Sequence, residues 1–183
     1  MSKVLDAACF LIDVINEQED CQASNISVNK LLYFAQGLSL AKTGKPIFSN
    51  TIEAWDMGPV IAKIYHQYKR YGDNSIPKQE YSLDSLNDEE QDFLLEAVAR
   101  YGMHNASELI KFTHASDTPW ARHYQKGVKN IPIPQNEIKD YFTDNIQLSF
   151  YNENSVVAVN TDECGRLLLP KEIEDAWGEY NAQ

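Results

Sequence analysis

Apolar residues recur at helical spacing through most of the first 142 residues, and this pattern constrains the fold more than any other feature of the chain. In the first segment they fall three and four positions apart, at Val4, Leu5, Ala8, Leu11, Ile12 and Ile15. Such spacing predicts a helix over residues 2–19 with one apolar face. A second helix is expected from an N-cap at Ser27 to Leu40. Its apolar residues cover more than one stripe, which predicts a central helix packed on several sides.

Proline positions predict where other helices begin, because a proline at the first helical position loses no hydrogen bond. On this ground Gly58-Pro59 is expected to form a corner from which a third helix runs to Gly72. Pro119 is expected to open another helix in the same way. Residues 47–55 alternate loosely, which predicts a short extended strand or an irregular crossing.

Polar capping residues predict the remaining helices. Asn87, followed by acidic residues, is expected to begin a helix that ends at about Tyr101, because the helix dipole favours negative charge at its N-terminus. A shorter helix is expected after Asn105, and another over residues 135–142.

The pattern changes after residue 143 to short β-favouring runs. Residues 146–150 and 155–159 are joined by a polar turn, which predicts a hairpin, and residues 171–180 predict a last helix. The expected fold class is therefore mainly α. A compact multi-helix domain over residues 1–142 is followed by a short α+β extension over residues 143–183, which is expected to pack on it.

The chain is acidic, with 27 Asp and Glu against 16 Lys and Arg and a net charge of −11 over 183 residues. Such a chain is repelled by phosphate backbones unless its basic residues gather on one face. Nucleic acid is therefore disfavoured as the primary partner. A basic protein partner fits the charge better.

The cellular location is predicted from cysteines and apolar runs. Cys9, Cys21 and Cys164 are odd in number and share no metal-binding spacing, so they are expected to be reduced thiols. Asp6 and Asp13 interrupt the apolar N-terminal stretch, and no run approaches the ~20 apolar residues of a membrane span. We expect a cytoplasmic protein with no membrane partner.

No known catalytic motif occurs in the sequence. The four histidines, His66, His104, His114 and His123, lack the spacing of metal ligands, and no glycine-rich phosphate loop or nucleophile elbow is present. His114 and His123 could meet in space, although a pair of histidines satisfied by structural contacts explains them as well. We expect no enzyme, no cofactor and no metal.

Several blocks of sequence keep their order and spacing over residues 1–142. In the first half these are Asn29-Lys30-Leu31-Leu32-Tyr33-Phe34-Ala35-Gln36-Gly37, Gly44-Lys45-Pro46-Ile47-Phe48, Ile52-Glu53-Ala54-Trp55, Gly58-Pro59-Val60 and Ile64-Tyr65. In the second half they are Tyr101-Gly102, Ala106-Ser107-Glu108-Leu109, Thr113-His114 and Pro119-Trp120. Together these blocks closely resemble the Panacea (SocA-like) antitoxin domain.

This resemblance implies a mostly helical antitoxin of a bacterial or phage-associated type II toxin–antitoxin pair. Members of the family neutralise a cognate toxin by direct binding, and SocA-like members look like adaptors that deliver the toxin to an AAA+ protease. The toxin differs from pair to pair, so the resemblance does not name it. The oligomeric state also stays open.

The residues of the family blocks have a plain structural interpretation. Leu31 and Leu32 are expected in the core, with Trp55 and Trp120 as anchors of the core or its rim. Gly58-Pro59 is expected as the corner described above. Pro119 and His114 complete the set of family residues that we expect to be structural.

Partner-binding residues are sought among aromatic and basic side chains. Tyr65, Tyr68 and Tyr71 lie three apart beside Lys69, and aromatic groups with basic neighbours make good interface anchors. These tyrosines could equally cover the core with their rings and leave their hydroxyls exposed to water.

A second candidate row joins Lys30 and Tyr33 to Gln36 on the second helix. If exposed, this row is a polar ledge, and a toxin contact explains Lys30 about as well as a bond within the fold does.

A DNA-binding regulator of phage or plasmid origin is the rival function. The second and third helices are too far apart for a helix-turn-helix motif. Residues 159–173 look faintly like the GRxxxP segment of AbrB-type transcription factors. We interpret this tail instead as a variable extension that packs on the helical domain or helps select the toxin.

Overall fold

The computed structural model describes residues 2–18, 21–128 and 130–146, of which residues up to 143 belong to one compact unit. This unit is mainly helical with a small two-stranded sheet, which confirms the predicted fold class. The expected hairpin and last helix of the C-terminal extension lie outside the described residues. The division of the chain into two domains therefore stays a prediction. None of the helices described is both long and apolar enough to cross a membrane.

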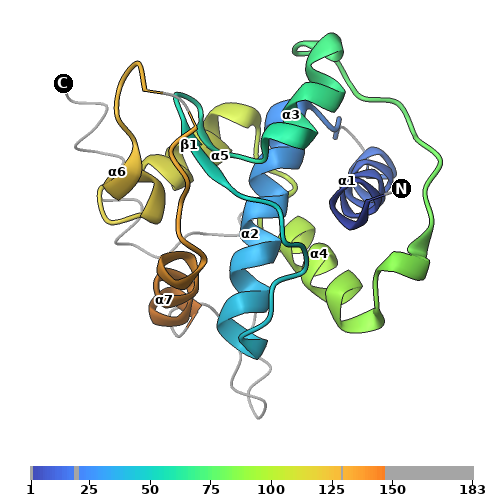
Figure 1. Cartoon of the computed structure of the whole chain (residues 1–183). Coiled ribbons are helices and arrows are strands. Elements are labelled where there is room, and N and C mark those ends of the chain that lie inside the picture. The colour runs from blue at the N-terminus through green and yellow to red at the C-terminus, as the bar shows by residue number, and fades with distance from the viewer. Residues whose placement is uncertain (1, 19–20, 129, 147–183) are drawn as a thin grey trace, which may run out of the picture. The chain divides into compact units, whose positions relative to one another are not determined.

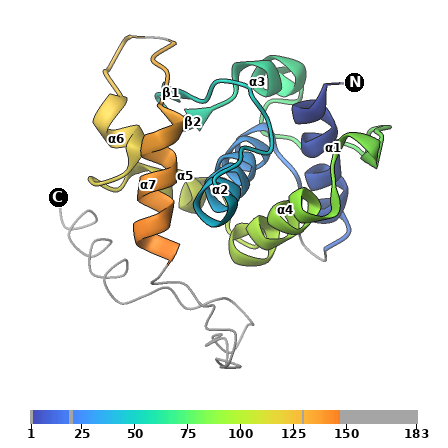
Figure 2. The same ribbon diagram turned by 60° about the horizontal axis from the view of Figure 1, so that its bottom comes forward.

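Helix α2 (Asn25–Thr43) is the centre of the unit. It lies between α7 (Gln135–Ile146) on one side and α1 (Lys3–Asn16) and α4 (Asp88–Tyr101) on the other (Figures 1 and 2). Every α2 residue from position 27 to position 40 is buried, as predicted for a helix packed on several sides.

The start of α2 differs from the prediction by one turn. Its N-cap is Ser24, whose side chain accepts a hydrogen bond from the Ser27 N–H. Ser27 closes a capping box by accepting from the Ser24 N–H, so it is the third residue of the helix. Two serines three positions apart offered the same capping chemistry, and the earlier one is used.

The structure corrects the prediction for Gly58-Pro59, which does not begin a helix. Residues Gly58–Val60 form strand β2, which pairs in antiparallel fashion with β1 (Glu53–Trp55), so that Ala54 lies opposite Pro59. The Ala54 N–H points away from β2, to the carbonyl of Ile131 at 2.8 Å. Ala54 and Pro59 therefore form a pair that shares no backbone hydrogen bonds. Proline, which has no N–H, fits the strand at such a pair.

Helix α3 (Ala62–Tyr68) begins only after β2, and it continues as the short 3-10 helix η1 (Lys69–Tyr71). Gly72 ends η1 with a φ of 57°, at the residue predicted to stop the third helix. On the other edge of β1, the Ile133 N–H donates to the Ile52 carbonyl at 2.8 Å. The segment around residue 132 therefore borders β1, which lies between it and β2.

The later helices begin where capping residues predict. Helices α4, α5 (Ala106–His114) and α6 (Pro119–His123) have the N-caps Asn87, Asn105 and Thr118, and each cap side chain accepts a backbone N–H. Helix α7 starts at the predicted residue and extends four residues beyond the predicted end.

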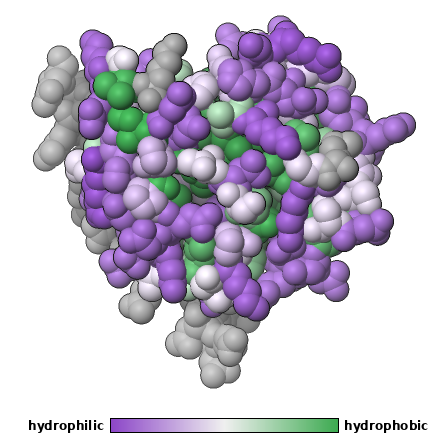
Figure 3. All heavy atoms as spheres, in the orientation of Figure 1, coloured by the Kyte–Doolittle hydropathy of each residue, from purple (hydrophilic) through white to green (hydrophobic). Residues whose placement is uncertain are grey.

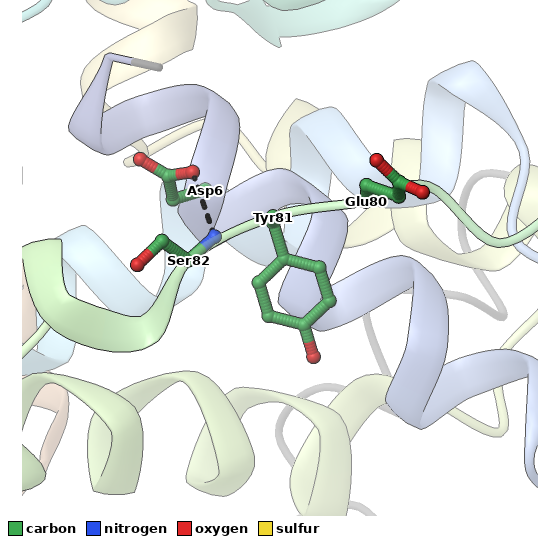
Figure 4. A pocket seen from close by; sticks show the side chains of 4 residues that line it. All are labelled: Asp6, Glu80, Tyr81 and Ser82. Carbon is green, nitrogen blue, oxygen red and sulfur yellow. Dashed lines mark hydrogen bonds between the residues drawn. The ribbon is translucent and has the colours of Figure 1, made fainter.

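The segment between η1 and α4 crosses α1 and includes the 3-10 helix η2 (Leu83–Ser85). Two buried carboxylates of α1 fasten it. Asp6 accepts hydrogen bonds from the Ser82 N–H and the Ser85 hydroxyl, and Asp13 accepts from the Tyr81 hydroxyl. Figure 4 shows Asp6 and Ser82 joined at the edge of a shallow open pocket that Glu80 and Tyr81 also line.

Candidate protein-binding surface

The polar side chains of α2 hold the β1–β2 hairpin by its main chain. The Lys30 ammonium donates to the Pro59 carbonyl at 3.0 Å, and the Asn29 side-chain oxygen accepts from the Ile61 N–H at 2.9 Å. Both bonds fall on the edge of β2 that faces away from β1. They satisfy main-chain groups that would otherwise be buried without partners.

Gln36 holds the preceding segment of the chain in the same manner. Its side-chain N–H donates to the Phe48 carbonyl at 2.9 Å, and its oxygen accepts from the Ile47 N–H at 2.9 Å. Asn25 donates to the Tyr65 carbonyl at the start of α3. Four polar residues on one helix therefore position residues 47 to 65 of the chain.

Gly58 allows α5 and α2 to approach the hairpin closely. Its φ is +98°, and a Cβ atom there would lie 2.6 Å from the Thr113 hydroxyl oxygen and 2.8 Å from Lys30 Cε. A larger residue would be strained by its backbone and would also clash. The glycine of the Gly58-Pro59-Val60 block is therefore required by packing.

A buried lysine and a half-buried histidine lie beside this contact. Burial lowers the pKa of Lys30 to about 7. Burial, with the nearby charge of Lys30, lowers the pKa of His114 to about 4. The His114 ring packs on Trp120 with ring centroids 3.7 Å apart, and its buried Nε2 has no hydrogen-bond partner among the described residues. Both groups are enclosed by packing, and neither lines the pocket of Figure 4.

Helix α6 holds the hairpin from the opposite side. The Trp120 indole N–H donates to the Trp55 carbonyl at 2.8 Å, and the Trp120 ring stacks on Tyr124. The Tyr124 hydroxyl donates to the Asp56 carboxylate at the hairpin turn. The turn between β1 and β2 is thus fixed by α2 and α6 together.

The fixed hairpin carries a cluster of partly exposed aromatic side chains. The Trp55 ring lies 4.9 Å from that of Tyr65 and 6.3 Å from that of His66, measured between centroids. Tyr65 is 37% exposed, and Met57 at the turn is 50% exposed. We call Trp55, Met57, Tyr65 and His66 the hairpin aromatic surface. Figure 3 shows a mainly hydrophilic face with separate groups of hydrophobic side chains, and its scale colours Trp, Tyr and His on the hydrophilic side, so the hairpin aromatic surface does not stand out in it.

A row of basic residues continues this surface along α3 and η1. Lys63, His66 and Arg70 are three and four positions apart, and all are exposed, as is Lys69. No acidic residue occurs between positions 57 and 72. Among the described residues, neither lysine nor Arg70 takes part in an ion pair. We call Lys63, Lys69 and Arg70 the basic α3 row, which meets the hairpin aromatic surface at His66.

The structure places the predicted partner-binding residues in two groups. Tyr65 and Lys69 are exposed and Tyr71 is half-buried, as a partner contact requires. The other three are buried, with exposed fractions of 1% for Lys30, 2% for Tyr33 and 1% for Tyr68. The row of Lys30 and Tyr33 on α2 is therefore not an exposed polar surface. Gln36 is buried in the same row.

The buried residues of this prediction have partners within the fold or fill its core. Lys30 binds the hairpin, Tyr68 contacts the Cys9 sulfur, and Tyr33 packs edge-on against Phe142. They can contact a partner only if the unit repacks.

The residues expected to be structural lie in or beside the core. Six of them are buried, namely Leu31, Leu32, Gly58, Pro59, Pro119 and Trp120. Trp55 and His114 are half-buried, and His123 faces the Glu137 carboxylate at 3.0 Å rather than His114.

Sequence reasoning missed Met57 and Tyr124 as parts of this region. A methionine next to a predicted helix start gave no reason to expect exposure, and only the turn between β1 and β2 places it at the surface. The described residues contain no cluster of three or more His, Cys, Asp or Glu side chains able to hold a metal ion.

The sequence that builds this scaffold and hairpin matches a known protein family. Residues 28–121 match the family described as Antitoxin SocA-like, Panacea domain, and the chain belongs to this family. Within it, the chain is 33% identical over 113 residues to Antitoxin SocA of Caulobacter vibrioides (strain NA1000 / CB15N). The match covers 55% of this chain and 60% of that relative's length. No solved structure matches the chain.

Proposed function

We propose that this protein is the antitoxin of a type II toxin–antitoxin pair and neutralises a cognate toxin by direct protein–protein binding. The observation that carries the proposal is membership of the SocA-like antitoxin family, supported by the similarity to Antitoxin SocA. The hairpin aromatic surface gives the proposal a physical basis, because exposed aromatic groups on a rigid support are good interface anchors.

The proposal includes no chemistry on the protein's own side chains. Lys30 and His114 have lowered pKa values of the kind found in active sites, but each is explained by burial against the hairpin. The pocket of Figure 4 is shallow and lies over α1, away from both groups. Packing within the fold, rather than catalysis, therefore accounts for these two residues.

Co-expression with the neighbouring gene tests this function. Expression of that gene alone should arrest growth, and simultaneous expression of this protein should restore it. Co-purification of the two proteins in a fixed ratio would support direct binding. Failure of this protein to relieve the arrest would contradict the proposal.

Two further measurements separate the possible mechanisms. The half-life of the toxin, in cells with and without their AAA+ proteases, distinguishes occlusion of the toxin from its delivery to a protease. A salt-dependent shift of the protein's own promoter fragment, without any relief of toxicity, would instead support a DNA-binding regulator.

A further inference from the structure

Acidic and basic side chains gather at two separate places, the start of α4 and the basic α3 row. The first turn of α4 carries Asp88, Glu89 and Glu90, and Asp92 is exposed one turn later. The basic α3 row carries three cations in a chain whose net charge is −11. A surface with the opposite sign to the whole molecule selects its partner locally, because salt screens charges more than about 10 Å away.

The two acidic side chains of the hairpin already have hydrogen-bond partners within the unit. Glu53 accepts a hydrogen bond from the Trp55 indole N–H at 2.8 Å, and Asp56 accepts one from the Tyr124 hydroxyl. Neither carboxylate pairs with Lys63 or Lys69. Arg70 lies over the ring of the neighbouring Tyr71, whose hydroxyl accepts a hydrogen bond from it. These cations are thus available to groups on another molecule.

We propose that the hairpin aromatic surface and the basic α3 row together form a docking site for an acidic polypeptide segment of the partner toxin that also carries apolar side chains. This proposal rests on the proposed antitoxin function and names the chemistry of the segment that is bound. Apolar groups of the segment pack against Trp55, Met57 and Tyr65. Its carboxylates face Lys63, Lys69 and Arg70.

A protein segment fits this surface better than nucleic acid does. Binding to phosphate backbones draws on many cations, whereas this row has three within a strongly acidic chain. The rings of the surface also pack edge to face, with interplanar angles of 63° for Trp55 and Tyr65 and 74° for Tyr65 and His66. Such packing covers ring faces that a stacked base would need.

Labelled peptides test the chemistry of the site on the full-length protein. One probe is a synthetic peptide of Asp, Glu, Leu and Phe, and the matched probe has Lys at every acidic position. Fluorescence anisotropy should show saturable binding of the acidic peptide that weakens with added salt, and weaker binding of the basic peptide. A single-stranded oligonucleotide is the third probe.

Charge-reversed variants locate the site. The double variant Lys63→Glu, Arg70→Glu should weaken binding of the acidic peptide by about tenfold, because attraction becomes repulsion. The control Lys45→Glu, Lys139→Glu makes the same charge change at exposed positions near the other end of α2 and should change binding by about twofold or less. Thermal melting curves check that both variants are folded.

Four results would overturn the docking proposal: no binding of the acidic peptide, equal loss in both double variants, better binding of the basic peptide, or preference for the oligonucleotide. The growth-rescue experiment separates this failure from that of the proposed function. If the Lys63→Glu, Arg70→Glu variant still neutralises the toxin, the antitoxin function stands and this site is not the contact. If the unaltered protein fails to neutralise while the acidic peptide still binds, the function fails and the surface chemistry stands.

Discussion

The buried amine of Lys30 links protonation to folding at the scale of a single residue. Its pKa is about 7 in the folded protein, against an ordinary value of 10.5. At pH values between about 7 and 10.5, the Lys30 amine is protonated in the unfolded chain and deprotonated in the folded chain. The free energy of unfolding must therefore rise as the pH rises from 7. Below pH 7 both states carry the charge, and the cost of burying it is fully present.

A Lys30→Met variant should lose this pH dependence. The unaltered protein should gain about 1.5 kcal/mol between pH ~7 and pH ~8.5, a window that ends before tyrosines titrate. Urea unfolding followed by circular dichroism at both pH values measures the difference. The exposed-residue variant Lys45→Met is the control and should keep the slope. An unchanged slope in Lys30→Met would show that the amine is charged and solvated in the folded state.

Gly58 makes a second prediction at the residue scale. Gly58→Ala should destabilise the protein by about 2–4 kcal/mol, because an unfavourable backbone conformation adds to a clash with Thr113. Gly44→Ala is the matched control. Gly44 also has a positive φ, of 72°, but its Cβ would meet only the end of Lys139 at 3.7 Å, so about 1 kcal/mol is expected. Equal losses of stability in the two variants would show that close packing around Gly58 adds nothing to the cost of its backbone conformation.

At the scale of elements, the crossing of residues 72–87 over α1 is held by the Asp6 and Asp13 carboxylates, Asp13 accepting from Tyr81 and pairing with Lys78. Asp6 accepts two hydrogen bonds, from the Ser82 N–H and the Ser85 hydroxyl. The exposed Lys78 lies in the same segment, where trypsin can cut if the backbone opens locally.

Asp6→Ala should therefore speed tryptic cleavage after Lys78 several-fold at a temperature where the protein stays folded. Removal of the carboxylate breaks the bonds that tie the Ser82 N–H and the Ser85 hydroxyl to α1, so that local opening becomes easier. Asp84→Ala, at an exposed position of the same segment, should change the rate little. Mass spectrometry of the first fragments gives both rates. Similar cleavage of Asp6→Ala and the unaltered protein would mean that other contacts hold the crossing.

The sequence predicts an element well when the residues that determine it are close neighbours in the chain. The starts of α4 and α5 follow from a capping side chain within three residues and that of α6 from Pro119, and these predictions are confirmed. The helix expected at Gly58-Pro59 is wrong because the same dipeptide suits a strand once Ala54 lies opposite it. That pairing depends on α2, which lies far away in the sequence.

The candidate site was harder to predict for a related reason. Lys30, Tyr33 and Tyr68 carry polar groups and so were expected near the surface, but the fold buries them. The cation of Lys30 is tolerated because a main-chain carbonyl lies 3.0 Å away. Tyr65 and Lys69, from the same predicted set, are exposed, and their role in partner binding stays a prediction.

At the scale of the whole molecule, the contacts described above lie within residues 2–143. We predict that a fragment of residues 1–146 folds by itself. Its thermal unfolding should be cooperative, and its helical circular dichroism should match that of the described helices. A fragment that is unfolded, while the full chain is folded, would show that residues 147–183 complete the core.

The bonds from Lys30 and Asn29 to the hairpin end on a carbonyl and an N–H, groups that every residue other than proline provides in full. These two bonds therefore hold the hairpin by its main chain and do not depend on which outward-facing side chains it carries. Substitutions at Met57 or Tyr65 can accumulate with little effect on these two bonds. Under the proposed function, one framework can serve toxins of different shape when only its outward-facing residues change.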